Sequence, residues 1–176
     1  MKQLVEELLF LARSDAGTVE VSHAAYTEFD YSDSVLNCAL LFEAVAFENK
    51  VILNNDIVPG IHVCGSETQM KQVVTILLDN ACKYAGLHGT VSVSLKSASH
   101  HAVLTVNNTG EPIPSSDQKH IFERFYRTDK SRVRKEGGYG LGLSIARTIV
   151  EQHKGKITVS SSQEEGTTFT VVLPEL

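Results

Sequence analysis

The sequence has few cysteines and no long apolar run, and each absence excludes a class of protein. Its three cysteines, Cys38, Cys64 and Cys82, lie far apart, without a C-x-x-C pair or the regular spacing of a zinc site. We therefore expect reduced cysteines in or near the core. No apolar run approaches the ~20 residues of a membrane span, and Glu6 and Glu7 interrupt the stretch that a secretory leader would need. The sequence as given is expected in the cytoplasm.

The chain also lacks an excess of positive charge. Its 16 lysines and arginines face 21 aspartates and glutamates, for a net charge of −5, which argues against a general nucleic-acid binder. Six basic residues nevertheless crowd between Arg124 and Lys135. Such a run is usually a solvated surface, but beside a phosphate-binding loop it can supply cations to a polyphosphate. With 176 residues, 42% of them hydrophobic, the chain is long enough for one domain with a substantial core and an appendage.

The most informative stretch is FERFYR at residues 122–127 followed by GGYGLGLSIA at residues 137–146. Alternating glycines that lead into a helical apolar pattern are typical of a phosphate-binding helix start, because the N-terminal N–H groups of the helix are unpaired and no side chain keeps an anion away. Plain turns remain an alternative. The G-x-G-x-G spacing without a preceding strand argues against a dinucleotide site of the Rossmann type.

Periodicity predicts the secondary structure coarsely. We expect helices over residues 1–13, 33–49, 66–86, 117–126 and 141–153, and strands over residues 50–58, 61–64, 90–95, 102–106, 156–161 and 167–173. Ser66 and Gln69 mark one helix start, and Gly155 is expected to stop the last helix. This order predicts an α+β fold, a two-layer sandwich of three helices over one mixed, mostly antiparallel sheet. The first helix is too short to be stable alone, so it must pack on the domain or pair with a second copy.

The helix from Ser66 carries LLDNACKYA, in which Asn80, Lys83 and Tyr84 share one face. An amide oxygen is a good ligand for magnesium, and a lysine one turn later can reach the same phosphates. A polar stripe on an ordinary helix is the alternative for this motif taken alone.

Five motifs in order resemble the catalytic ATP-binding domain of bacterial sensor histidine kinases. LLDNACKYA, VNNTGEPIP, IFERFYRTDKSR, GGYGLGLSIARTIVEQHKGKI and GTTFTVVLP match its N, G1, F, G2 and G3 boxes, at plausible separations. The opening MKQLVEELLFLARSD is similar to the end of the second helix of the dimerisation and phosphoacceptor domain. The resemblance implies that residues 1–15 belong to that domain and residues 16–176 to the catalytic domain, with a long ATP lid.

The resemblance assigns roles to residues of this chain. Asn80 would ligate Mg²⁺ that bridges the ATP phosphates, Lys83 would contact phosphate, and Tyr84 would line the nucleotide. Asn108, Gly110 and Thr167 would surround adenine. Tyr126 would line the same site, and Arg127 and Arg132 would reach the phosphates from the lid. The polyphosphate would lie against Gly138, Gly140 and Gly142 and the backbone of Leu141 and Leu143.

Two positions depart from the family pattern. Asn108 stands where an aspartate usually accepts a hydrogen bond from adenine, and Pro112 replaces a glycine, which stiffens that turn and removes an N–H group. Ile76 stands where hydrolysing relatives such as type II topoisomerases have a water-activating glutamate, which disfavours a strand-passage or mismatch-repair ATPase.

The resemblance implies an ATP-dependent protein histidine kinase that uses ATP and Mg²⁺ and passes the phosphoryl group to a response regulator. The acceptor histidine would lie on the phosphoacceptor domain, because none of the seven histidines has the H-E-x-x-T-P neighbours and each is expected to be a surface or satisfied residue. The parent protein would be membrane-anchored, and the helix over residues 1–13 offers a possible homodimer contact. A non-catalytic nucleotide-sensing module and a serine kinase of the anti-sigma-factor type are the alternatives.

Overall fold

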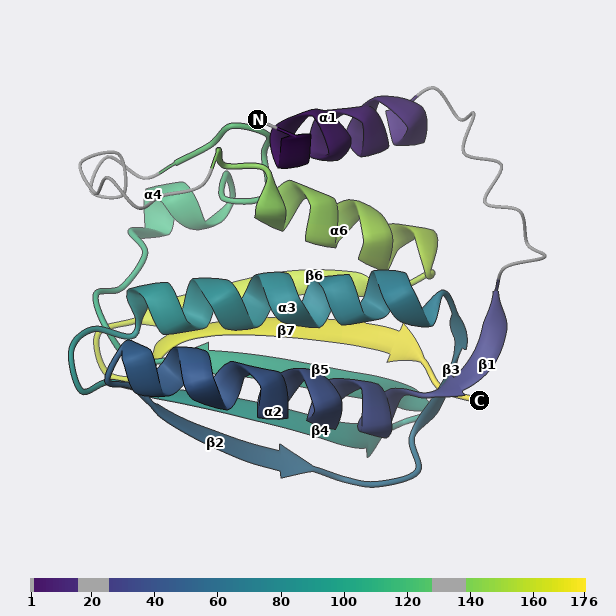
Figure 1. Ribbon diagram of the computed structural model, residues 1–176, viewed down its shortest axis with the longest axis horizontal. Coiled ribbons are helices and arrows are strands. Elements are labelled where there is room, and N and C mark those ends of the chain that lie inside the picture. The colour runs from purple at the N-terminus through teal and green to yellow at the C-terminus, as the bar shows by residue number, and fades with distance from the viewer. Residues whose placement is uncertain (1, 16–25, 128–138) are drawn as a thin grey trace.

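A five-stranded sheet forms the centre of the structure, a computed structural model that describes residues 2–15, 26–127 and 139–176 (Figure 1). Its order is β2-β4-β5-β7-β6. The strands are β2 (Ile52–Ile57), β4 (Thr90–Ala98), β5 (His101–Asn108), β6 (Lys156–Ser162) and β7 (Gly166–Pro174). β2 pairs with β4 in parallel and the other pairs are antiparallel. The predicted mixed, mostly antiparallel sheet is confirmed.

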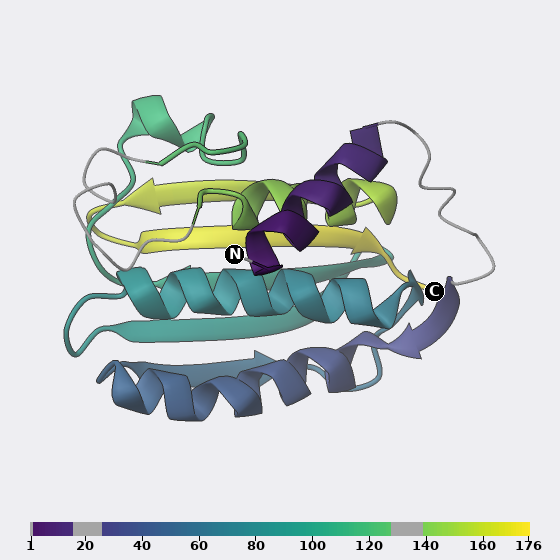
Figure 2. The same ribbon diagram turned by 45° about the horizontal axis from the view of Figure 1, so that its top comes forward.

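Three helices cover one face of this sheet (Figures 1 and 2). They are α2 (Tyr31–Glu48), α3 (Glu67–Tyr84) and α6 (Gly142–Gln152). Side chains on alternate strand positions, such as Val91, Val93 and Leu95 of β4, are buried against Leu77 and Leu78 of α3 in one core. The predicted α+β sandwich of three helices over a sheet is therefore confirmed.

The first helix, α1 (Lys2–Asp15), lies across α6 (Figure 2). Leu11 is buried, and the Gln152 side-chain amide donates to the Ser14 hydroxyl oxygen over 3.3 Å. Of the two alternatives expected for this short helix, the structure shows packing on the domain. Its Val5, Leu8 and Leu9 side chains are exposed. No helix in residues 2–15, 26–127 and 139–176 has the length and apolar character to cross a membrane.

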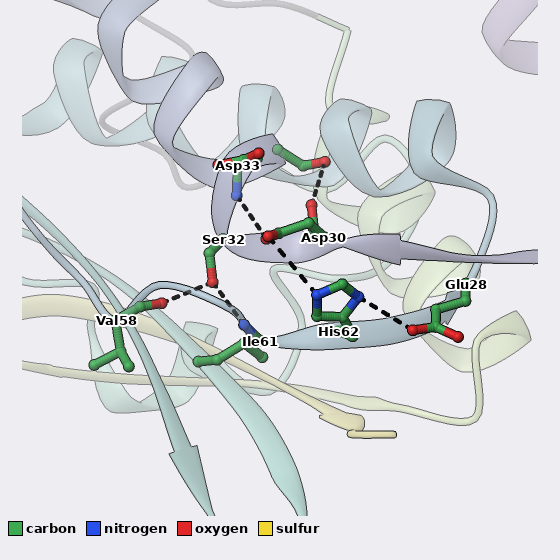
Figure 3. Close-up of polar contacts among 8 residues, drawn as sticks. Glu28, Asp30, Ser32, Asp33, Val58, Ile61 and His62 are labelled. Carbon is green, nitrogen blue, oxygen red and sulfur yellow. Dashed lines mark hydrogen bonds and ion pairs between the residues drawn. The ribbon is translucent and has the colours of Figure 1, made fainter.

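A second, two-stranded sheet was not expected from the sequence. β1 (Thr27–Asp30) pairs antiparallel with β3 (His62–Gly65). Figure 3 shows how polar side chains join this sheet to the start of α2. The Asp30 carboxylate caps the helix by accepting from the Asp33 N–H over 3.0 Å. His62 lies 3.3 Å from the Glu28 carboxylate and 3.8 Å from that of Asp30.

Ser32 fixes the connection between β2 and β3 to the same helix start. Its hydroxyl donates to the Val58 carbonyl over 2.7 Å, and its oxygen accepts from the Ile61 N–H over 3.0 Å (Figure 3). Because both capacities of this buried hydroxyl are used, the turn at Pro59 and Gly60 is held against α2.

The expected helix over residues 117–126 is wrong. The structure has the single turn α4 (Ser115–Gln118), followed by turns to Phe125. Phe125 has φ 61°, a left-handed conformation that ends any helix, and its N–H donates to the Gly140 carbonyl over 2.9 Å. Contacts with distant residues decide this segment, and helical periodicity does not report them.

Two smaller expectations are also corrected. Cys38 and Cys82 are buried, and burial raises the pKa of both thiols, but Cys64 is exposed because it alternates with the buried Val63 on β3. All three cysteines are free, as expected. The left-handed residue after α6 is Lys154, with φ 58°, and not Gly155.

Candidate nucleotide-binding site

The last two turns of α3 carry the polar stripe that the sequence indicated. The Asn80 side chain is half-buried, and its amide nitrogen donates to the Ile76 carbonyl over 3.1 Å. That bond leaves the amide oxygen as an acceptor. One turn on, the Lys83 ammonium pairs with the Asp79 carboxylate over 2.5 Å, and Tyr84 is exposed. An amide oxygen that can ligate a metal and a lysine ammonium therefore lie on one helix face.

The N-terminus of α6 lies beside this stripe. A Cβ atom on Gly142 would be 3.4 Å from the Ile76 side chain, one turn before Asn80. Leu141 is fully buried and anchors the start of the helix, whereas Leu143 is half-buried against the core. The unpaired N–H groups of the first helical turn thus start beside Ile76, one turn of α3 from Asn80, an arrangement that suits an anion.

Gly140 brings two chain segments together just before α6. It has φ +75°, and a Cβ there would lie 2.9 Å from the Tyr126 carbonyl oxygen. Only glycine fits such a position without strain. The described chain therefore reaches Arg127, which is half-buried, and resumes at Tyr139 close by. Arg132 and Gly138, to which the resemblance assigned phosphate contacts, lie outside the described residues.

The other part of the site lies at the end of the central strands. Asn108 and Thr167 face each other across β5 and β7, and their side chains are 3% and 5% exposed. The Asn108 amide nitrogen donates to the Thr109 carbonyl over 2.6 Å, which leaves the Oδ1 atom as an acceptor. In this orientation Asn108 presents the same kind of group as the aspartate that it replaces.

Gly110 connects that strand end to α3. Its φ is +117°, and an added Cβ would lie 2.1 Å from the Tyr84 carbonyl oxygen. The end of the Asn80 helix and the exit of β5 are therefore packed backbone against backbone, which requires glycine. Tyr126 is half-buried, with its ring 5.7 Å from that of His120.

The turn at Pro112 is held by contacts that the sequence did not indicate. The Ile113 N–H donates to the Ser161 hydroxyl oxygen over 2.9 Å. The Gln118 side-chain amide donates to the Ile113 carbonyl over 2.9 Å and to the Ser161 carbonyl over 3.0 Å. Ser161 stands within a run of three serines, so only the strand register identifies it.

The structure thus brings together Asn80, Lys83, Tyr84 and the start of α6, and places Asn108, Gly110 and Thr167 at the adjoining strand ends. The acceptor oxygen of Asn80 and the glycine-lined helix start suit a metal-bound polyphosphate. No group of three or more metal-ligating side chains occurs in the ranges described, so such a metal would depend on phosphate oxygens as well as Asn80.

Comparisons with known proteins agree with this geometry. Residues 65–176 match the family of histidine kinase-, DNA gyrase B- and HSP90-like ATPases. The sensor histidine kinase RppB of Synechocystis is 36% identical over 175 residues, covering 99% of this chain and 38% of the relative. The sensor histidine kinase YkoH of Bacillus subtilis is 35% identical over 181 residues, covering 99% of this chain and 37% of the relative. The chain therefore spans less than two-fifths of the length of these relatives.

Solved structures show the same architecture. The catalytic domain of histidine kinase ThkA superposes with a TM-score of 0.75 at 28% identity, covering 85% of this chain and 95% of that chain. Full-length ShkA in complex with AMPPNP superposes with a TM-score of 0.83 at 23% identity, covering 98% of this chain and 35% of that chain, a likeness of fold. The protein belongs to the histidine kinase-, DNA gyrase B- and HSP90-like ATPase family, and within it to the ATP-binding catalytic domains of sensor histidine kinases.

Proposed function

We propose that this chain binds Mg-ATP and transfers the γ-phosphoryl group to a histidine on the phosphoacceptor domain of its parent protein. The observation that carries the proposal is that the glycine start of α6 lies against Ile76, one turn before Asn80 on α3. Phosphoryl transfer requires positioning and charge neutralisation more than covalent chemistry, and this arrangement supplies both.

Each residue has a defined part in this proposal. Asn80 Oδ1 ligates Mg²⁺, which neutralises phosphate charge when it is bound. Lys83 contacts phosphate, which requires it to leave Asp79. Such an exposed i,i+4 pair is worth only about 0.3–0.5 kcal/mol, so a polyphosphate can displace it. Arg127 and Arg132 add positive charge, and the backbone at Gly138, Gly140, Leu141, Gly142 and Leu143 holds the phosphates.

The adenine end of the site uses Asn108, Gly110 and Thr167, with Tyr84 and Tyr126 beside the nucleotide. Ile76 offers no group that could activate water, which favours transfer over hydrolysis. We further propose that residues 1–15 are the end of the second phosphoacceptor-domain helix and residues 16–176 the catalytic domain. The parent protein is anchored in the membrane with this domain in the cytoplasm, and it relays phosphate to a response regulator.

Two measurements test the proposal. Calorimetry of the chain with Mg²⁺ and ATP should show binding at or below millimolar nucleotide, and its absence would refute the proposal. Adding a separately expressed phosphoacceptor domain of the same parent protein and γ-labelled ATP should produce acid-labile phosphohistidine. Binding without transfer would favour the non-catalytic nucleotide-sensing module that Asn108 and Pro112 suggest.

A further inference from the structure

Three polar side chains form a row across the sheet at the adenine end of the site. Ser161 of β6 pairs with Thr167 of β7, and Thr167 pairs with Asn108 of β5. All three project from the face that the helices cover, as do the buried neighbours Ile157, Phe169 and Val106 on the same strands. The next residue in the row, Val91 of β4, is apolar and fully buried. The polar part of the row is thus confined to these three strands.

The hydrogen bonds around Ser161 indicate which hydroxyl of the Ser161–Thr167 pair is the donor. The Ser161 oxygen accepts from the Ile113 N–H over 2.9 Å, and it lies 2.7 Å from the Thr167 oxygen. Within the described ranges, the Ser161 hydroxyl makes no other hydrogen bond to an acceptor. Ser161 therefore donates to Thr167, because a hydroxyl whose oxygen already accepts a bond, here from the Ile113 N–H, is the stronger donor. Either direction leaves one hydroxyl proton for a further partner, and in this one it is the proton of Thr167.

This direction determines what Thr167 can offer to a ligand. Its oxygen accepts from Ser161, so its own O–H proton remains available as a donor. Beside it, Asn108 uses its amide nitrogen on the Thr109 carbonyl and keeps Oδ1 as an acceptor. Together the row presents one acceptor and one donor side by side.

We propose that Ser161 is a positioning residue that sets the base selectivity of the nucleotide site. Adenine carries an amino donor at position 6 beside a ring-nitrogen acceptor at position 1, which complements an acceptor next to a donor. Hypoxanthine and guanine carry the reverse, a carbonyl acceptor beside an N–H donor. The row therefore selects adenine over 6-oxopurines through the orientation of two uncharged groups.

This inference rests on the proposed function. It also implies that Asn108, unlike an aspartate, must be held in one orientation to accept from adenine. A carboxylate could accept from adenine without help, whereas an amide has one donor and one acceptor end and must be oriented. The Thr109 carbonyl orients Asn108, and Ser161 orients the Thr167 hydroxyl. Selectivity in this chain thus depends on residues outside the direct contacts.

The test compares Mg-ATP with Mg-ITP by calorimetry. The two nucleotides differ only at position 6 and in the proton at position 1 of the base. The ratio of their affinities therefore measures whether the site offers an acceptor to position 6 and a donor to position 1. The wild type should prefer ATP by roughly tenfold or more. Ser161→Ala should reduce that ratio at least about threefold, because the Thr167 hydroxyl can then rotate to accept. Ser161→Thr, which keeps a hydroxyl, should restore most of it.

Two control variants separate orientation from structural support. Gln118→Ala removes the bonds to the Ile113 and Ser161 carbonyls but leaves the hydroxyl pair intact, so it should lower both affinities while keeping their ratio. Ser160→Ala changes the exposed neighbour of Ser161 on β6 and should change neither. An unchanged ratio in Ser161→Ala, or an equal loss of the ratio in Gln118→Ala, overturns the inference alone. A wild type that binds neither nucleotide overturns the proposed function with it.

Discussion

The two ends of the helix pair α3 and α6 differ in what their polar groups contact. The helices run antiparallel, so the start of α3 lies beside the end of α6, and the end of α3 beside the start of α6 (Figure 1). At the first end, His153 is buried and satisfied on both sides. Its Nδ1 atom donates to the Ile149 carbonyl over 2.8 Å, and its Nε2 atom accepts from the Ser66 N–H over 2.9 Å.

This first end, called the closed end below, also leaves little space around His153. A Cβ on Gly65 would lie 2.2 Å from the His153 ring, and the Tyr26 ring stacks on the same imidazole with centroids 4.7 Å apart. Burial lowers the pKa of His153, although its bond to the Ile149 carbonyl acts in the opposite direction. The histidine is thus held neutral as an acceptor for the N-terminus of α3.

At the second end, called the open end below, polar groups remain available for a ligand. The Asn80 amide oxygen is left as an acceptor, and among the described residues a Cβ on Gly142 would meet one side chain, that of Ile76, at 3.4 Å. At the first end His153 and the start of α3 therefore satisfy each other, whereas at the second end polar groups remain available for a ligand. A site that keeps unsatisfied groups for its ligand needs a rigid support elsewhere, and the closed end provides it.

The largest effect is expected from breaking the open end at its ligand contact. Asn80→Ala should weaken Mg-ATP binding about a hundredfold or more, because the magnesium ligand is lost. The free energy of unfolding should change by less than about 1 kcal/mol, since within the described residues the side chain bonds to its own helix alone. Calorimetry and urea unfolding measure the two quantities. Retained nucleotide affinity would show that Asn80 is not the metal ligand.

Disrupting the closed end should mainly lower the free energy of unfolding, whereas Asn80→Ala mainly lowers nucleotide affinity. Gly65→Ala places a methyl group against the His153 ring and should lower the free energy of unfolding by about 1–3 kcal/mol. Gly142→Ala is the matched control at the open end, where the same methyl group has room. We expect its stability to change by less than about 1 kcal/mol while its Mg-ATP affinity falls. Equal stability losses in the two variants would contradict the comparison.

The closed end should also respond to acid. Because the folded-state pKa of His153 lies below its usual 6.5, folding is favoured above that pH and loses this contribution as the pH falls through the folded-state pKa. His153→Gln keeps an acceptor for the Ser66 N–H without a proton to gain. Urea unfolding at pH 7.5 and pH 5.0 should therefore show a smaller loss in this variant than in the wild type. Parallel losses would exclude His153 as the source.

The smallest effect is expected at the exposed pair beside the open end. Asp79→Asn removes the partner of Lys83 and should change the free energy of unfolding by no more than about 0.5 kcal/mol. Mg-ATP affinity should rise roughly twofold, because the lysine no longer has to leave a carboxylate and one negative charge is gone. A fall in affinity would mean that Asp79 itself supports the site.

Local sequence signals predicted most of the helices and strands, and the polar helix face of the candidate site. The N-cap at Ser66, the alternation along β4 and β5 and the polar face with Asn80 and Lys83 each follow from spacing within a few residues. The capping box expected at Ser66 is only half formed. Ser66 accepts from the Gln69 N–H over 3.4 Å, but its own N–H donates to His153, which is 87 residues away.

The sequence by itself determined most of the helices and strands, because periodicity, caps and glycine positions act over short distances. The resemblance of five ordered motifs indicated the family. The tertiary structure decided which residues meet. Strand register placed Ser161 beside Thr167 and Asn108, antiparallel packing placed His153 at the start of α3, and the contact of Gly140 with Phe125 replaced an expected helix by turns. Such contacts join residues far apart in the chain, and no pattern in either partner alone encodes them.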